Sequence, residues 1–221
     1  THRGVSLTRN HEIIIIIIIN RDCGLKVGMN CRLCGKELES VAHLTNGCGK
    51  LAQKAYKRRH DRMGLRVYWE ICRKYSVKCA DKWYKEVPDE VRCSDDGKVE
   101  VWWDRSVETP KKMEDGNRPD VVIVDRGRRE WIFVDFSVPW DKNVVSKEEA
   151  KVEKYAPLAK EVRKVHGVST KILPIVVGSL GVVSRNLVGY LKELGVPDVL
   201  GGLQTSAIIG TTLILRKTLS L

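Results

Sequence analysis

The sequence predicts an α/β fold, a mixed sheet flanked by helices, preceded by a small cysteine- and histidine-containing module and a basic helical linker. Three observations predict it: short runs rich in β-branched and aromatic residues between residues 99 and 138, helical periodicity after residue 146, and a compact set of cysteines before residue 50. The 221 residues, 43% of them apolar, are enough for one ordinary domain with a small appendage. This excludes a purely disordered regulator.

The net charge indicates which kind of partner the protein binds, and the number of cysteines indicates whether it forms disulfides. Lys and Arg number 39 against 28 Asp and Glu, a net charge of +11, so we expect a polyanion, nucleic acid first, as partner. Seven cysteines, none after Cys93, do not form the even framework of a secreted disulfide scaffold. The run Ile13–Ile19 is far shorter than the ~20 apolar residues of a membrane span, so we expect no membrane partner.

The N-terminal half divides by composition into three segments. Residues 1–30 have no assigned role, and their isoleucine run is either a buried strand or a low-complexity feature. Residues 31–50 hold the cysteine and histidine cluster. Residues 51–95 form the basic helical linker and first core helix, since Lys50 to Lys85 contains twelve Lys or Arg against three acids, with aromatic residues that include Trp83 and Tyr84. We expect one or two amphipathic helices there, with a basic outer face.

Residues 96–221 predict the order β, β, β, α, β, α, α. Strands are expected over 99–103, 121–124, 131–138 and 172–177, the second and third as a hairpin around Arg126-Gly127-Arg128. Ser146 and Glu149 have the spacing of a capping box, which predicts a helix from there to Gly167. Two further helices are expected over 183–194 and 203–219.

Four residues in the first fifty have the spacing of a metal site. Cys31, Cys34, His43 and Cys48 form C-x2-C-x8-H-x4-C, a set of three thiolates and one imidazole typical of structural zinc. The alternatives are four unrelated residues or a redox C-x2-C, although no thioredoxin-like βαβ unit precedes it. We expect Zn²⁺ to hold a minidomain too small to fold unaided.

Two aspartates in the predicted sheet are candidates for a second metal site. Asp120 opens one strand of the hairpin, and Asp135 lies within the next, so the two carboxylates can approach. An acid inside the apolar run 131–136 is costly to bury without a cation or a proton. Paired carboxylates are typical ligands of a Mg²⁺ that also holds phosphate oxygens.

A lysine on the following helix could complete this site by stabilising negative charge on a phosphate. On a helical wheel Lys151 lies roughly 60° from the centre of the sheet-facing stripe and Lys154 roughly 120°, which favours Lys151. The alternative is that both are ordinary solvated lysines.

These motifs together resemble the C-terminal region of site-specific non-LTR retrotransposon polyproteins, a CCHC zinc knuckle followed by a restriction-like endonuclease. The resemblance covers roughly residues 25–180 and includes Arg59-His60-Asp61, Arg118-Pro119-Asp120, Asp135 and Lys151-Val152-Glu153-Lys154-Tyr155. It implies a restriction-endonuclease-like PD-(D/E)XK core with Mg²⁺ on Asp120 and Asp135. Ser137 stands where the general motif has its lysine, so the lysine must come from the helix, as Lys151 or Lys154.

The resemblance further implies a function and partners. Such a domain nicks double-stranded target DNA in the nucleus, and the 3′ hydroxyl primes reverse transcription of the element RNA by the reverse transcriptase region of the same polyprotein. No Tyr-x-Asp-Asp box occurs in this sequence, so polymerase activity is not expected here. The phosphate-contacting candidates are Arg58, Arg59, His60, Arg62 and Arg118, and His60 or Glu70 is a further candidate to reach the acids.

Two alternatives from other classes stay open. One is a catalytically inactive zinc-knuckle module of a retroelement remnant, which binds nucleic acid without cutting it. The other is an interaction domain in which Asp135 only pairs with Arg118 or Arg128. Metal-dependent nicking would distinguish the enzyme from both.

Overall fold

The computed structural model describes residues 28–79, 86–110, 113, 115–219 of the chain. Its sheet has five strands in the order β1-β2-β3-β4-β5, all antiparallel to their neighbours except the parallel pair β4–β5. The expected isoleucine run, Trp83 and Tyr84 lie outside the described residues. The strands are β1 Val91–Cys93, β2 Val99–Trp103, β3 Val121–Asp125, β4 Glu130–Ser137 and β5 Ser169–Val176.

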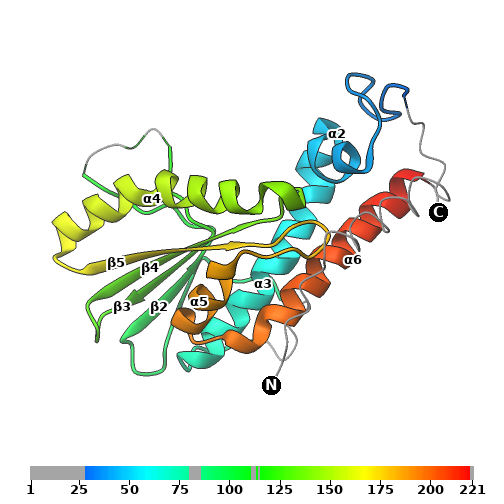
Figure 1. The fold of residues 1–221 in the computed structure, drawn as a ribbon. Coiled ribbons are helices and arrows are strands. Elements are labelled where there is room, and N and C mark those ends of the chain that lie inside the picture. Colours follow the sequence, from blue (N-terminus) through cyan, green and yellow to red (C-terminus); the bar gives the residue numbers. More distant parts are fainter. Residues whose placement is uncertain (1–27, 80–85, 111–112, 114, 220–221) are drawn as a thin grey trace.

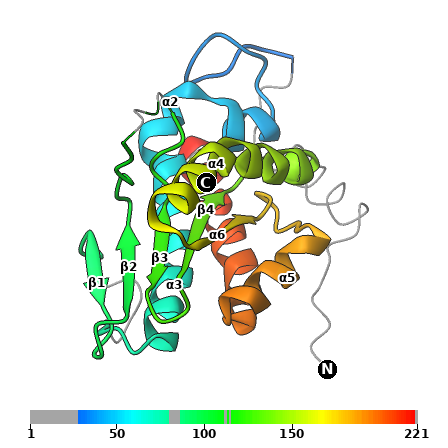
Figure 2. The ribbon, with the colours of Figure 1, turned by 90° about the vertical axis from the view of Figure 1, so that its left-hand side faces the viewer.

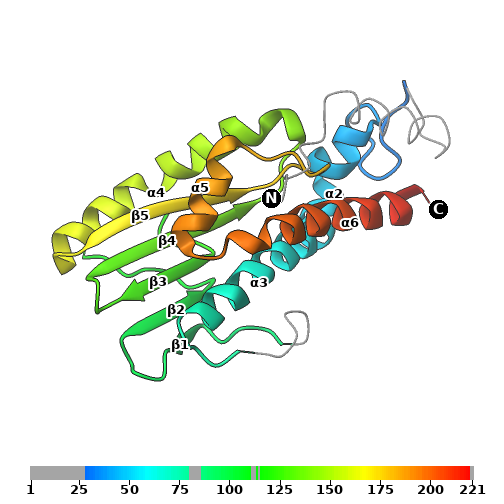
Figure 3. The same ribbon diagram turned by 60° about the horizontal axis from the view of Figure 1, so that its bottom comes forward.

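Helices cover both faces of this mixed sheet (Figure 1). The helix α4 lies on one face, and α3, α5 and α6 lie on the other, as the view in Figure 3 also shows. The helices are α2 Gly49–Leu51, α3 Lys57–Lys74, α4 Val144–His166, α5 Arg185–Leu194 and α6 Leu200–Leu219, with π-helical turns at His43–Gly47 and Ala52–Tyr56 and 3-10 turns at Asp141–Asn143 and Pro197–Val199.

The expected strands and the hairpin are confirmed within a few residues. Val121 pairs with Val134 and Val124 with Trp131, which makes β3 and β4 the antiparallel hairpin. The short edge strand β1 was not predicted, because three residues carry too little alternation to identify a strand. The sheet therefore has one strand more than expected.

The capping-box prediction at Ser146 is wrong. The helix α4 begins at Val144, and the hydroxyl of Ser146 donates to the carbonyl of Asn143 (3.2 Å) instead of accepting an N–H at an N-cap. The 3-10 turn Asp141–Asn143 already provides the first turn of this helical segment. By contrast, Ser184 does cap α5, where its side chain accepts the N–H of Leu187.

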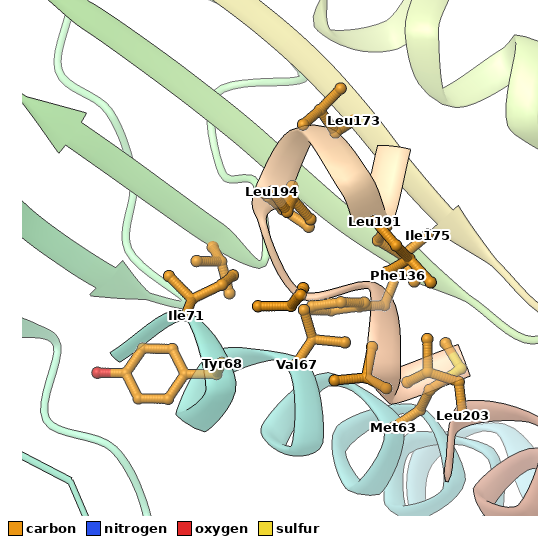
Figure 4. Close-up of a cluster of buried hydrophobic side chains, with 14 of the residues drawn as sticks. Met63, Val67, Tyr68, Ile71, Phe136, Leu173, Ile175, Leu191, Leu194 and Leu203 are labelled. Atoms are coloured by element: carbon orange, nitrogen blue, oxygen red, sulfur yellow. The ribbon is translucent and has the colours of Figure 1, made fainter. Parts of the chain in front are cut away.

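Strict alternation along β3 and β4 divides the core between the two faces. Val121, Ile123, Val134 and Phe136 face α3, α5 and α6, in the cluster shown in Figure 4. Val122, Val124 and Phe133 face α4 together with Tyr155 and Leu158. Asp135, between Val134 and Phe136, is therefore directed to the α4 side.

Small residues let α3 approach its neighbours closely. A Cβ at Gly64 would lie 2.8 Å from the Phe136 ring, so glycine lets α3 pack directly on the sheet. On α6, a Cβ at Gly210 would lie 2.6 Å from Cγ of Arg59. This close packing brings the start of α3, including His60, to the end of the sheet where β4 ends.

The helix α6 is the most apolar of the four long helices α3, α4, α5 and α6 that the structure describes. The stretch Pro197–Leu219 has the length and composition of a membrane-crossing helix, and 44% of its apolar window is buried inside the structure. That buried side packs on α3 and on the cysteine-containing segment, where Leu215 and Leu219 contact Leu44. Figure 2 shows α6 behind α4 and the sheet. These contacts account for the apolar residues on its buried side, whereas Ile208, Ile209 and Leu213 are exposed.

Candidate functional site

The structure brings the four predicted zinc ligands together. One ligand atom from each of Cys31, Cys34, His43 and Cys48 lies within 4.8 Å of the others. The Cys34 Sγ is 3.3 Å from His43 Nε2, and the Cys31 and Cys48 sulfurs are 3.9 Å apart. Three thiols and an imidazole in this arrangement fit a tetrahedral Zn²⁺. The sequence prediction of a possible Cys3His metal site is thus confirmed.

Local backbone turns and a carboxylate position these ligands. Gly35, with φ +67°, donates its N–H to the carbonyl of Cys31 (2.8 Å) and closes the turn between the first two cysteines. Nδ1 of His43 lies 3.0 Å from Oε2 of Glu37, which leaves Nε2 directed at the cysteines. A carboxylate behind a histidine is the usual way of fixing the ring for metal binding.

The thiols differ in how readily they ionise. Backbone N–H groups, first that of Lys36, lower the pKa of Cys34 to about 6. Burial raises the pKa of Cys48 to about 11. A bound cation would favour the thiolate form of both, so metal binding would release protons here.

The two candidate acids lie at the end of the sheet, and each has a defined set of partners. Asp120 immediately precedes β3, and its Oδ2 accepts the N–H of Phe136 (2.6 Å) and lies 3.2 Å from Nε2 of His60. Asp135 is 4% exposed and accepts the hydroxyl of Tyr155 while it pairs with the ammonium of Lys151. Because Phe136 follows Asp135 in β4, its N–H holds Asp120 close to the second acid.

The structure distinguishes the two candidate lysines by position. Lys151 is directed inward, its side chain 17% exposed, and pairs with Asp135. Lys154 is 38% exposed, lies 3.7 Å from Asp115, and stacks over the ring of Tyr155. Only Lys151 therefore accompanies the acids, although the role of either lysine stays a prediction.

The charges of this site are strongly coupled. Burial raises the pKa of Asp135, as does the charge of Asp120, whereas Lys151 and Tyr155 lower it. Burial on its own would lower the pKa of His60, but its hydrogen bonds to Asp120 and Asp61 outweigh this effect and raise that pKa to about 10. At neutral pH a protonated His60 therefore lies between Asp61 and Asp120, and Lys151 pairs with Asp135.

Sequence reasoning missed one of these residues, Tyr155, as part of the site. Tyr155 was predicted only as an apolar position on the sheet-facing stripe, because periodicity ignores its hydroxyl. That hydroxyl contacts Asp135 and donates to the carbonyl of Arg118 (3.1 Å). Of the two further candidates, His60 reaches Asp120, whereas Glu70 pairs with Arg73.

The predicted phosphate contacts lie in different environments. Arg58 is exposed and Arg62 half-buried on α3. Arg118 is exposed and pairs with Asp104 (2.9 Å). Arg59, in contrast, is 3% exposed, and its guanidinium donates to Thr211 Oγ1 and to the carbonyls of Thr45 and Val138. The prediction of a phosphate contact by Arg59 is therefore corrected: its side chain joins three segments inside the protein.

The pairing of Asp135 expected for an interaction domain is also not observed. Arg118 pairs with Asp104, and Arg128 lies 3.8 Å from Asp125 at the hairpin turn. Asp125 also accepts the N–H of Arg128 (2.8 Å), as a turn residue does.

An open cleft of about 850 Å³ begins at His60. Its walls come from the start of α3, the segment after β4 and the start of α4, and among the described lining residues they carry the exposed Lys57 and Lys147, together with His60, and no acid. The lining includes Asn46, Tyr56, Lys57, Arg59, His60, Ser137, Val138, Trp140, Asn143 and Lys147. A polyanion in this cleft would pass His60, which lies 3.2 Å from Asp120, although neither acid lines the cleft.

No family model matches the chain, and no curated protein matches its sequence.

Proposed function

We propose that the protein is a Mg²⁺-dependent DNA endonuclease that nicks its target by phosphodiester hydrolysis. The observation that carries the proposal is the buried Asp135 beside Asp120, Lys151, Tyr155 and His60, next to a cleft with cationic walls. A buried acid coupled to a second acid and a lysine is costly unless it serves chemistry or binds a cation.

We further propose that the core is restriction-endonuclease-like. In support, an acid precedes one strand of a hairpin, a second acid lies within the next strand, and a lysine comes from the helix that follows. This is the order of functional groups expected for the PD-(D/E)XK pattern when the lysine has moved from position 137 to the helix.

Each residue would have a definite part in hydrolysis. Asp120 and Asp135 would hold Mg²⁺, which when bound polarises a phosphate oxygen and lowers the pKa of a water molecule. Lys151 would stabilise the negative charge that develops on the phosphate. Tyr155 and His60 would orient the two carboxylates through the hydrogen bonds already described, and the cations of the cleft would bind the DNA backbone without reading its sequence.

The biological setting follows from the resemblance. We propose that the chain is the zinc-knuckle and endonuclease region of a non-LTR retrotransposon polyprotein. Its nick would supply the 3′ hydroxyl for target-primed reverse transcription in the nucleus, with the reverse transcriptase region and the element RNA as further partners. The Cys3His cluster would bind a structural Zn²⁺ and take no part in the chemistry.

Nicking of supercoiled plasmid tests this proposal. We expect Mg²⁺-dependent nicking by the wild type, abolished by EDTA and in Asp120→Ala and Asp135→Ala, and strongly reduced in Lys151→Ala. Glu153→Gln and Lys160→Ala alter exposed charges of α4 away from the acids and are the matched controls. Nicking that survives in both aspartate variants would contradict the proposal.

One observation favours the non-catalytic alternative. Lys151 and Tyr155 together occupy the carboxylate of Asp135, so the pair could serve the fold alone. In that case the protein binds DNA with a steep salt dependence, and plasmid stays supercoiled at every Mg²⁺ concentration.

A further inference from the structure

A second concave surface lies on the far side of α3 from the acids. It is a groove of about 300 Å³ between the start of α3 and the end of α6. Its floor is apolar and includes Leu51, Ala55 and Leu213, the last of these 45% exposed. Five cations that are not buried stand around it, and none of the described lining residues is acidic: Lys50, Lys54, Arg58, Arg62 and Lys217.

Four of these cations form a regular row. Lys50, Lys54, Arg58 and Arg62 follow one another at every fourth residue, from α2 through the π-helical turn Ala52–Tyr56 into α3, and all four line the groove. Like charges at this spacing repel and destabilise a helix. The row therefore costs stability in the free protein, and an anion with regularly spaced charges would relieve the repulsion.

The groove is narrow because its two helices meet closely. Gly210 lies in the groove wall, where Cγ of Arg59 would clash with any added Cβ. Figure 3 shows α3 and α6 side by side along much of their length. A duplex presents its bases inward and has no apolar face that could enter a slot of this size, whereas a single strand exposes both sugars and bases beside its phosphates.

The groove is continuous with the cleft at the acids. Lys57 lines both that cleft and the outer surface of α3, and Lys54, Arg58 and Arg62 line both the outer surface and the groove. A nucleic acid bound at the acids could thus extend around α3 along these cations, past Asp61, the one acid among the described residues that line the outer surface.

We propose that the groove between α3 and α6 binds one extended single strand of nucleic acid, its phosphates along the row of cations and its bases or sugars on the apolar floor. The proposal adds Lys50, Lys54, Lys217 and the exposed face of α6 to the binding surface. It rests on the proposed function only for the expectation of a nucleic-acid partner and does not require the acids to be catalytic.

Fluorescence anisotropy with the full chain tests the proposal. The probes are a labelled oligothymidylate and a labelled hairpin duplex, each titrated over a series of salt concentrations. For the triple variant Lys54→Gln, Arg58→Gln, Lys217→Gln, we expect the slope of log affinity against log salt for the single strand to fall by about 2, at ~0.7 for each lost contact. The matched control carries Lys160→Gln and Lys164→Gln on the exposed surface of α4 and keeps the wild-type slope.

A second variant tests the apolar floor of the groove and leaves the charge of the protein unchanged. Leu213→Gln is expected to weaken oligothymidylate binding several-fold and to leave duplex binding unchanged. An equal loss of affinity for the two oligonucleotides, or no loss for either, would overturn the proposal. The proposal would also fail if the variants lost binding to anionic lipid vesicles and kept their affinity for oligonucleotides. Plasmid nicking by the same preparations tests the proposed function separately. Nicking without binding of the single strand would contradict the proposed role of the groove. Binding of the single strand without nicking would contradict the proposed nuclease activity.

Discussion

The cysteine cluster and the acid site differ in how completely protein groups enclose them. At the cluster, four ligands converge on one point, and Glu37 and a hydrophobic contact with α6 support them from behind. At the acid site, two carboxylates are held by Lys151, Tyr155 and His60 beside an open cleft. A closed ligand set is typical of structural metal sites, and an open one of sites that admit substrate. On the basis of this difference we propose that the cysteine cluster serves the fold and that the acid site serves chemistry.

The two sites are nevertheless joined through one carbonyl group. The side chain of Asn46, three residues after the ligand His43, donates to the carbonyl of Val138 (2.7 Å). Arg59 donates to the same carbonyl (3.1 Å) and to that of Thr45 (2.9 Å). Because Val138 is three residues after Asp135, the metal-binding segment forms part of the wall of the acid-site cleft.

Loss of a zinc ligand should have the largest effect on the fold. Cys48→Ser removes a buried ligand, and metal binding supplies roughly 10 kcal/mol in small zinc-dependent peptides, so we expect loss of bound zinc and unfolding of residues 28–51. Zinc content and limited proteolysis measure both. Cys93→Ser changes an exposed cysteine outside the cluster and should keep one zinc per chain. Equal zinc content in the two variants would refute the assignment.

Removal of Lys151 should cost less but still several kcal/mol. Lys151→Ala leaves the buried Asp135 without its cation, and breaking such a pair costs about 3 kcal/mol. Because the pKa of Asp135 is raised in the folded protein, its ionised form opposes folding, and the penalty should grow as the pH rises above that pKa. Urea unfolding at pH 5 and pH 8 measures this difference. Lys154→Ala, which breaks only an exposed pair with Asp115, should cost at most ~1 kcal/mol at both pH values.

His60 should give a pH dependence of the opposite sign. Its pKa rises from 6.5 to about 10 on folding, so its stabilising contribution is complete below pH 6.5 and disappears as the pH rises through 10. His60→Asn should therefore cost about 2 kcal/mol at pH 6, after allowance for solvent screening, and much less at pH 10. Thermal unfolding of the zinc-loaded protein without added Mg²⁺ measures this difference. If the loss of stability in His60→Asn did not change with pH, the pKa of His60 would not be raised by Asp120 in the folded protein.

Asn46 should have the smallest effect, and it tests the link between the sites. Asn46→Ala removes one hydrogen bond to Val138, worth about 1 kcal/mol, and opens the cleft wall next to the acids. We expect normal zinc content, a slight loss of stability and faster amide hydrogen exchange around residues 136–138. The control is Gln53→Ala, which changes an exposed residue seven positions after Asn46 and should leave the exchange of residues 136–138 as in the wild type.

Sequence reasoning predicted the local features and missed those that depend on packing. Spacing alone identified the four cysteine and histidine ligands, because a single ion constrains residues close in sequence. Alternation identified the strands of the hairpin, and helical periodicity chose Lys151 over Lys154. The buried role of Arg59 could not be foreseen, since its acceptors lie at Thr45, Val138 and Thr211, far apart in the chain.

The same limit explains Tyr155 and the groove on α6. A tyrosine on an apolar stripe signals packing, and only the register of β4 against α4 places its hydroxyl at Asp135. The row of cations from Lys50 to Arg62 is visible in the sequence. Its partner surface, however, comes from Leu213 and Lys217, more than 150 residues later. Such contacts between distant segments carry no periodic signal.

The most direct test of the central claim is plasmid nicking by zinc-loaded protein, with Mg²⁺ added or withheld, for the wild type and Asp135→Asn. The variant keeps the shape of the side chain but removes the charge that would hold the ion. The account predicts nicking only by the wild type and only with Mg²⁺, at equal zinc content in both proteins. Equal nicking by Asp135→Asn, or none by the wild type, would contradict the assignment of chemistry to the open site.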